Sequence, residues 1–451
     1  MMRIHNIRTG CLGNFVKSDS RNHLANLCRV FLLFLMFVFA GSRRNAIYAQ
    51  EGRLAVKGYL QYENNTWAPP SGDYSWKEIS GLHNRLDINW YPGKHLSFYA
   101  GVRNNLDFGS LLSEYYPEYK NSLVKDNGFV NMTLKITDKK SCVLYSNIDR
   151  LNFKLQYDKL EIKVGRQRIN WGLNSIWNPG DIFNTYNYFD FSYISRPGSD
   201  AALVQYFTGN LSSLQIAAKL DNNDKLTSAA MYKFNLKGYD IQILGGVMNG
   251  KYMVLGGGWS GQIKGGGFTG EINYFKHYGR YSTSGTTGAS TSYPNIDQTS
   301  SRLVASVAYN YTFSNQIFIN TSVIYNSRGT TGKVHDAAAG NDSRQSNFLQ
   351  TNSITRENSF LQTGDLSPLT LTLSKCELFG EISYPFTPLI KGDFSAILNP
   401  YDGSAFLGPS ADISLTDNIQ LLAMAQIFTG KKETEYGNYG RIYYVRLKWT
   451  F

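Results

Sequence analysis

EISGLHNRLDINWYPGKHLSFYAGVRNNLD, residues 78–107, is the stretch that decides the fold. In its first half, apolar and polar residues alternate from Leu82 to Trp90, which is the two-residue period of a β-strand with two unlike faces. The same alternation returns from Leu96 to Asp107 after a short connection. One face of both halves carries Leu, Ile, Val and Trp, and the other carries Arg, Asp, His and Asn. The stretch therefore predicts an antiparallel hairpin with one apolar and one polar face.

Alternating segments of about ten residues continue along the rest of the chain. We expect eighteen strands, at residues 53–63, 78–91, 95–107, 142–157, 160–170, 197–208, 212–221, 226–236, 239–249, 251–263, 266–277, 300–313, 316–327, 371–384, 389–399, 404–415, 418–429 and 439–451. Repeated segments of this length are typical of a transmembrane β-barrel. The polar faces mix Arg, Lys, Asp, Glu, Asn and Tyr, which fits a water-filled interior better than a dry core.

Connection lengths follow the order of these strands. After every even-numbered strand the connection is short: Pro92–Lys94, Asp158–Lys159, Gly209–Leu211, Lys237–Gly238, Lys264–Gly265, Ser314–Asn315, Pro385–Pro388 and Thr416–Asp417. The long connections all follow odd-numbered strands: 65–76, 108–141, 171–196, 278–299, 328–370 and 430–438. A soluble sandwich has no reason to sort its loops in this way. We predict an all-β, transmembrane antiparallel β-barrel of about 18 strands (16–18), with short periplasmic turns and long extracellular loops.

The N-terminal residues 1–49 have the pattern of a signal peptide. Basic residues precede an apolar run at 30–41 that is too short to span a membrane as a helix. Cleavage is expected after Ala49, with Ala40 as the alternative. Residues 50–451 then form a single barrel domain with 38 basic and 33 acidic residues, a net charge of +5. This charge is too small and too dispersed to indicate nucleic-acid binding.

Sequence signals for catalysis, metals or cofactors are absent from the mature chain. Two distant cysteines, Cys142 and Cys376, make neither a disulfide framework nor a metal site. The sequence has no HExxH, GxSxG or CxxC motif around its four histidines, which are His83, His95, His277 and His335. We expect no cofactor, no metal site and no enzyme activity. A Ser–His–acid arrangement brought together inside the barrel stays open, because its members can be distant in sequence.

The last strand, residues 439–451, ends in aromatic residues. One face carries Tyr443, Trp449 and the terminal Phe451, and the other carries Arg446 and Lys448. Such a strand resembles the C-terminal signal of outer-membrane β-barrel proteins, which the bacterial insertion machinery reads. The resemblance implies that this machinery and the outer-membrane lipids are partners of the chain.

Residues 160–200, LEIKVGRQRINWGLNSIWNPGDIFNTYNYFDFSYISRPGSD, break the regular pattern. The strand ends among arginines, and a 26-residue connection follows at 171–196. A connection of that length is usually functional or disordered, and its many aromatic residues argue against disorder. We predict that it folds inward and narrows a channel, with Arg166 and Arg168 set against Asp181 and Asp190. The alternative is an external cap, held down by pairing of these arginines with Asp181 and Asp200.

Arg166 continues the outward phase of Ile162 and Val164, which would aim it at lipid. An arginine on the lipid face costs about 2–4 kcal/mol at the midplane and about 0–1 kcal/mol near the interface. We therefore expect either that Arg166 lies at the rim or that a bulge at Gly165 turns it inward. Our full set of pore-lining or constriction candidates is Arg166, Arg168, Asp181, Asp190, Asp200, Arg150, Arg103 and Arg85.

The motif series VGRQRINWG, WNPGDIFN, FDF and RPGSD, within residues 149–208, resembles porin-like outer-membrane proteins of Bacteroidetes-type bacteria. A more distant resemblance is to alginate-export-like porins. These resemblances imply a barrel in the cell outer membrane and name no substrate. Together with the strand pattern, they lead us to expect passive or weakly selective passage of small hydrophilic solutes. Two alternatives stay open: an outer-membrane enzyme acting on lipid or surface glycan, and a surface-glycan-binding barrel with a closed lumen.

Overall fold

The computed structural model describes residues 53–69, 76–115, 118–185, 188–189, 198–278, 301–332, 367–432, 434–437 and 439–451. The expected signal peptide lies outside these residues, as do nearly all of loop 278–299 and most of loop 328–370. The strands are β1 (Leu54–Ala68), β2 (Lys77–Gly93), β3 (Leu96–Phe108), β4 (Thr133–Lys139), β5 (Cys142–Tyr157), β6 (Leu160–Gln167), β7 (Ser199–Gly209), β8 (Ser212–Leu220), β9 (Leu226–Leu236), β10 (Tyr239–Met248), β11 (Tyr252–Ile263), β12 (Gly266–His277), β13 (Arg302–Thr312), β14 (Phe318–Asn326), β15 (Cys376–Thr387), β16 (Ile390–Leu398), β17 (Ala405–Thr416), β18 (Ile419–Thr429) and β19 (Arg441–Thr450).

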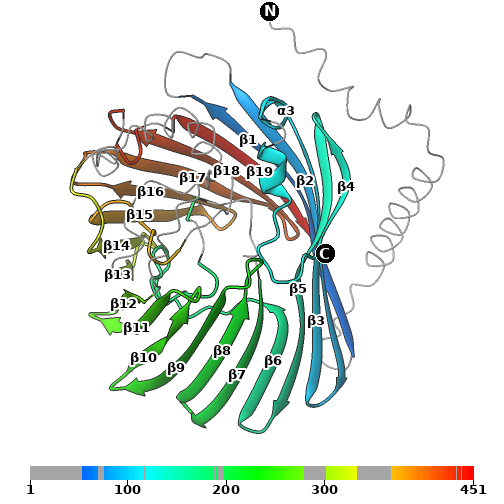
Figure 1. Cartoon of the computed structure of the whole chain (residues 1–451). Coiled ribbons are helices and arrows are strands. Elements are labelled where there is room, and N and C mark those ends of the chain that lie inside the picture. The colour runs from blue at the N-terminus through cyan, green and yellow to red at the C-terminus, as the bar shows by residue number, and fades with distance from the viewer. Residues whose placement is uncertain are drawn as a thin grey trace, which may run out of the picture.

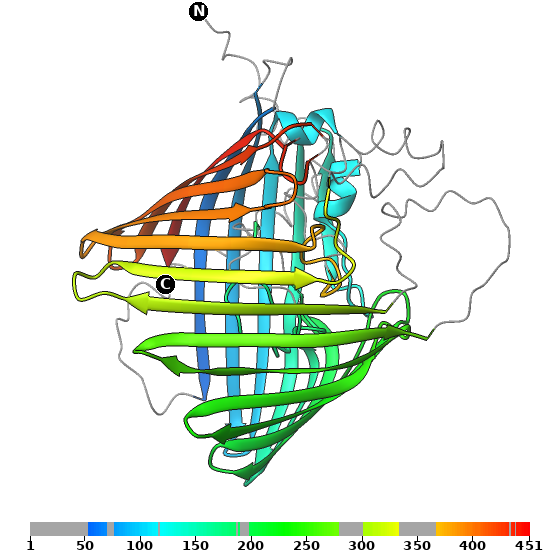
Figure 2. The same cartoon turned by 90° about the vertical axis from the view of Figure 1, so that its left-hand side faces the viewer.

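Eighteen of these strands close into a ring (Figure 1). Each is antiparallel to its sequence neighbour in the ring, with β3 pairing directly to β5, and β1 closes the ring by pairing with β19. The predicted antiparallel barrel of 18 strands is thus confirmed, with strand ends that differ from the expected ones by a few residues. Figure 2 shows the short hairpins that join successive strands.

One strand, β4, was not expected, because its seven residues lie within the predicted loop 108–141. It pairs with the upper part of β5, from Cys142 to Asn147, on the edge opposite β3. Lower down, the same edge of β5 pairs with β6, from Leu151 onward. β4 therefore continues the wall above the point where the short strand β6 ends.

The two faces of the wall differ as the alternation predicts. On β2, the outward Leu82 and Trp90 are 43% and 47% exposed, whereas the inward His83 and Arg85 are 6% and 2% exposed. Aromatic rings pack together on the outer surface near the short turns, as Trp90 does against Phe98. Exposed apolar side chains of most strands give the outer wall a surface that suits lipid, and polar side chains point into the barrel.

Two short helices, α3 (Ser110–Glu114) and α4 (Glu118–Leu123), follow β3. Leu111 and Leu112 of α3 are buried in the same apolar cluster as Trp67 and Ile79 at the upper ends of β1 and β2. No helix in the described part of the chain is long and apolar enough to cross a membrane.

Candidate functional site

Residues 171–183 lie inside the barrel and are packed against its wall. Trp171, Trp177 and Phe183 are buried, and Asp181 is 0% exposed. The indole of Trp171 donates to Gln215 of β8 at 2.8 Å, and its carbonyl accepts from Gln242 of β10 at 2.7 Å. The segment after β6 is therefore a built part of the interior rather than an external cap.

A buried carboxylate on β12 holds the middle of this segment. Glu271 Oε1 accepts the backbone N–H groups of Leu173 (2.5 Å) and Asn174 (3.0 Å), and Oε2 accepts that of Gly180 (2.7 Å). Glu271 is 0% exposed. One side chain thus satisfies three backbone donors that would otherwise be buried without partners.

Neutral side chains of the next two strands add further contacts. The Asn174 amide donates to Ser306 of β13 at 2.5 Å, and Ser306 donates to the Trp177 carbonyl at 2.9 Å. On β14, the Asn320 amide donates to the Ser175 hydroxyl at 3.1 Å. The segment therefore follows the inner wall from β8 to β14.

Aromatic residues carry the chain to the far side of the barrel. Trp177 packs edge-on against Phe379 of β15, and Tyr188 contacts the same ring. Phe189 contacts Phe406 of β17 and Phe428 of β18. In the ring of eighteen strands, β15 is nine positions from β6 in either direction. The connection thus starts at one wall and reaches the wall opposite.

Local sequence explains how the segment turns back. Asn178, Pro179, Gly180 and Asp181 form a β-turn, in which the Asp181 N–H donates to the Asn178 carbonyl at 3.1 Å. Proline is favoured at the second position of such turns because its φ is already fixed. The turn presents the N–H of Gly180 to Glu271.

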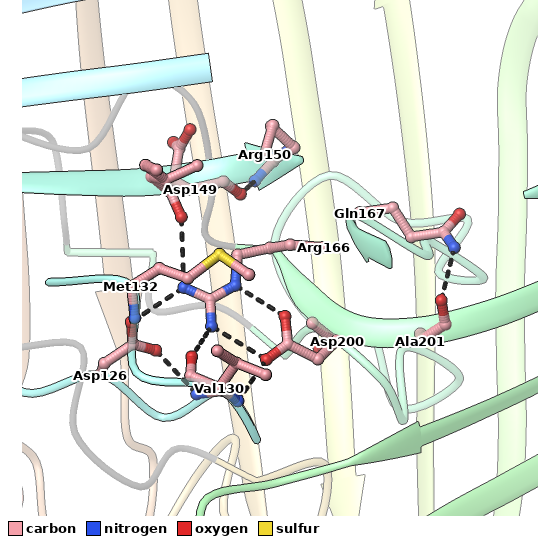
Figure 3. Close-up of polar contacts among 12 residues, drawn as sticks. Asp126, Val130, Met132, Asp149, Arg150, Arg166, Gln167, Asp200 and Ala201 are labelled. Carbon is pink, nitrogen blue, oxygen red and sulfur yellow. Dashed lines mark hydrogen bonds and ion pairs between the residues drawn. The ribbon is translucent and has the colours of Figure 1, made fainter. Parts of the chain in front are cut away.

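Arg166 is bound by Asp200, Asp126 and Val130 where β6 ends beside β7 (Figure 3). It is 3% exposed, and its Nε and Nη2 donate to the two carboxylate oxygens of Asp200 at 2.7 and 2.9 Å. Its Nη1 donates to Asp126 at 2.8 Å, and its Nη2 also donates to the Val130 carbonyl. The expected opposition of Arg166 to Asp181 is wrong, because both neighbouring carboxylates belong to other segments.

Arg166 lies at the rim of the wall and is not turned inward by a bulge at Gly165. The pairing of β5 with β6 runs without a register shift to Arg166, although Gly165 has a φ of +114°. Arg166 and Asp200 are directly paired on β6 and β7, and β6 ends one residue later. Residues 126–130 bind the pair, so the arginine keeps its outward phase without remaining exposed.

The remaining candidates fall at separate places. Arg168 donates to Asn170 at 2.9 Å, and Asp181 is buried in the inward segment. Asp190 lies outside the described residues. Arg150 donates to the Asp149 carbonyl at 2.7 Å. Arg166 therefore pairs with Asp200 and Asp126 and not with Asp181.

Arg85 and Arg103 belong to a polar cluster on the inner faces of β1, β2, β3 and β5. Arg85 forms an ion pair with Asp87 at 2.9 Å and another with Asp149, and Arg103 is buried beside it. The sequence predicted the inward direction of both arginines but not their partners. Two carboxylates therefore neutralise Arg85 within the wall.

His83, in the same cluster, contacts two carboxylates. Its Nε2 lies 2.9 Å from Asp107, and its Nδ1 lies 3.6 Å from Glu63. The nearby Ser80 has the opposite phase on β2, and its hydroxyl accepts from the Asn64 amide at 2.9 Å. This arrangement is that of a buried ionic network and not of a Ser–His–acid triad. Within the described ranges, no group of three or more His, Cys, Asp or Glu is placed to hold a metal ion.

Sequence reasoning missed Glu271, which binds three backbone N–H groups of the inward segment. Its inward phase on β12 was readable, but many inward positions of a polar-lined barrel are charged. Glycines nearby gave a weak signal: a Cβ at Gly258 would lie 2.9 Å from Leu173, so this wall approaches the segment closely.

Comparison with known proteins supports the architecture. A family model described as a protein of unknown function (DUF1302) matches residues 150–355. No curated protein matches the chain. Among solved structures, Acinetobacter baumannii OccAB2 is similar with a TM-score of 0.52 at 8% identity, over 89% of this chain and 99% of that one.

Pseudomonas aeruginosa OccK5 (OpdH) is similar with a TM-score of 0.50 at 10% identity, over 88% of this chain and 96% of that one. The outer membrane protein OpdK of the same organism has a TM-score of 0.49 at 9% identity, over 88% of this chain and 98% of that one. At these identities the likeness concerns the fold. The chain is a closed antiparallel β-barrel with the fold of these outer-membrane porins.

Proposed function

We propose that this protein is an outer-membrane channel for small hydrophilic solutes, with its passage narrowed by residues 171–185 and 188–189 of the connection after β6. The observation that carries the proposal is the built segment itself, which leaves β6, binds the inner wall and reaches β15 and β17 on the far side. A closed barrel of this strand number is wide enough for an aqueous channel. A segment packed across it reduces the open cross-section.

Passage is by diffusion down a gradient, with selection by size and charge at the narrowed level. Below that level, Lys154, Glu161 and Lys163 point into the barrel and are partly exposed. Charged groups beside a low-dielectric wall focus the field in such a passage, so they bias which ions enter. Arg166, being buried in the wall, contributes to stability rather than to selection.

Three further observations support this proposal. The outer wall exposes apolar side chains suited to lipid. Residues 149–208 resemble porin-like proteins of Bacteroidetes-type bacteria and, more distantly, alginate-export-like porins. The last strand pairs with both β1 and β18 and ends in Trp449 and Phe451, as a strand read by the insertion machinery does.

Planar-bilayer recording of the purified, folded protein tests the channel. We expect stepwise ion currents from the full chain and a larger single-channel conductance when residues 174–192 are deleted. Lys94→Ala, in the exposed short turn between β2 and β3, serves as the control and should leave the conductance unchanged. If the folded protein passes no ion current, the channel proposal is overturned.

We also propose that the barrel is not an enzyme. The contacts of His83 with Asp107 and Glu63, and the opposite phase of Ser80, support this. Purified protein should not hydrolyse phospholipid or surface glycan. Hydrolysis that disappears in the His83→Ala variant would contradict the proposal.

A further inference from the structure

We propose that Glu271 is the positioning residue that holds the segment 171–183 against the wall and so sets the width of the passage. This inference rests on the proposed channel function. It assigns the positioning of the segment to one side chain of β12 and not to the other side chains of the wall that contact the segment.

The geometry of the contact distinguishes Glu271 from its neighbours. Its two oxygens bind N–H groups on both sides of the turn, those of Leu173 and Asn174 before it and that of Gly180 after it. Residues 173–180 are therefore tied to the wall at both of their ends. A contact at one end alone would leave the turn free to swing.

The chemistry of the contact points the same way. Other polar wall contacts of residues 174–177 are made by the hydroxyl and amide groups of Thr269, Ser306 and Asn320. Hydrogen bonds to an ionised acceptor are roughly twice as strong as those between neutral groups. Three of them converge on Glu271, in a buried position where water cannot replace them.

Two glycines lie at this contact. A Cβ at Gly180 would lie 2.9 Å from Glu271 Oε2, nearer than carbon and oxygen normally approach. On the neighbouring strand β11, a Cβ at Gly258 would lie 2.9 Å from Leu173 Cδ1. Both ends of the bound stretch thus meet the wall where a glycine makes room.

Single-channel recording of Glu271→Gln tests the proposal. The amide keeps one acceptor oxygen but places an N–H₂ group against one set of backbone donors. We expect the population of the released segment to rise about tenfold, which corresponds to the loss of one charge-assisted hydrogen bond. The recording should show a larger conductance state or flicker between two levels.

The matched control is Glu63→Gln on β1. Glu63 is also buried on the inner face of the wall, but it accepts from the side chains of Gln61 at 3.0 Å and Tyr444 at 3.2 Å and not from the segment's backbone. This variant removes a similarly buried carboxylate, so it should keep the wild-type conductance. Equal changes in both variants would mean that charge alone matters and would overturn the positioning role.

A second variant keeps the test valid if Glu271→Gln folds poorly. Gly180→Ala pushes the turn and the carboxylate apart without altering a charge, and it should also raise the conductance.

A disulfide provides a rescue experiment in the Glu271→Gln background. The polar atoms of Ser175 and Asn320 lie 3.1 Å apart, so cysteines in their place should restore the wild-type conductance when they are oxidised. Reduction of the disulfide should remove the rescue.

The outcomes separate the two proposals. Absence of current through the wild-type protein overturns the channel itself. Normal wild-type current with unchanged Glu271→Gln and Gly180→Ala channels overturns only the positioning role of Glu271. Heat-modified mobility on gels confirms that each variant used is folded.

Discussion

Arg166 and Asp200 lie directly opposite each other on β6 and β7, and the guanidinium donates to both oxygens of the carboxylate, at 2.7 and 2.9 Å. Asp126, from the segment before β4, binds the same guanidinium at 2.8 Å. Arg166 therefore ties the segment that leads into β4 to the upper ends of β6 and β7. It does so where β6 ends and the wall is continued by β4.

Replacing Arg166 should destabilise the barrel. In Arg166→Ala, the partly buried carboxylates of Asp126 and Asp200 lose their cation, and about 3–5 kcal/mol, the typical cost for a fully buried pair, is the upper limit of the loss. We expect a lower unfolding midpoint in denaturant and faster proteolysis within residues 124–132. Ion selectivity should not change, because the arginine does not face the passage.

Lys135→Ala on β4 is the control for this experiment, since Lys135 is exposed. Its unfolding midpoint should stay near that of the wild type. An Arg166→Ala channel with wild-type stability and altered selectivity would restore the view that this arginine lines the passage.

Labelling of intact cells tests the orientation of the barrel. Tags inserted in residues 108–141, 278–299 or 328–370 should be accessible from outside, because long loops of such barrels are extracellular. A tag at Pro92–Lys94, in the short turn between β2 and β3, should be accessible only after the cells are lysed. The opposite labelling pattern would place the short turns on the cell surface.

Glu435, between β18 and β19, should make stability depend on pH. Burial raises its pKa above the ordinary value, and the charge of Asp402 adds to the rise. Its carboxyl is held by the Leu373 N–H at 2.9 Å and the Asn399 amide at 3.0 Å. Above the ordinary pKa the folded state binds more protons than the unfolded state, so the free energy of unfolding falls as pH rises through that window.

Melting curves of the wild type and Glu435→Gln in detergent should therefore diverge. As pH rises from about 4, the melting temperature of the wild type should fall. The melting temperature of the variant, which lacks that carboxyl, should fall less. Parallel curves for the two proteins would show that this carboxyl does not titrate differently on folding.

The contact between Trp177 and Phe379 should contribute to docking of the inward segment. Edge-to-face aromatic pairs are worth about 0.5–1.5 kcal/mol beyond their burial. A double-mutant cycle of Trp177→Ala and Phe379→Ala, measured by equilibrium unfolding, should give a coupling energy of that size. Additive effects of the two substitutions would mean that the rings do not support each other.

The sequence by itself determined the barrel. Alternation is a local property, because successive side chains of a strand point to opposite faces. The sequence alone therefore predicted that Leu82 faces outward and Arg85 faces inward. Loop lengths sorted by strand order required an even, closed ring. The seven-residue strand β4 was not predicted, because it is short and lies within a stretch that otherwise has the pattern of a loop.

The tertiary structure alone decided the partners inside the barrel. That the aromatic connection after β6 is ordered followed from composition, but its attachment to Glu271 depends on bringing residues 173 and 271 together. Arg166 was visible as an exception to the alternation, yet its partners, Asp126 and Asp200, lie 40 and 34 residues away. Sequence phase fixes which face a side chain takes, whereas the pairing of distant charges depends on how the closed sheet and its loops pack in space.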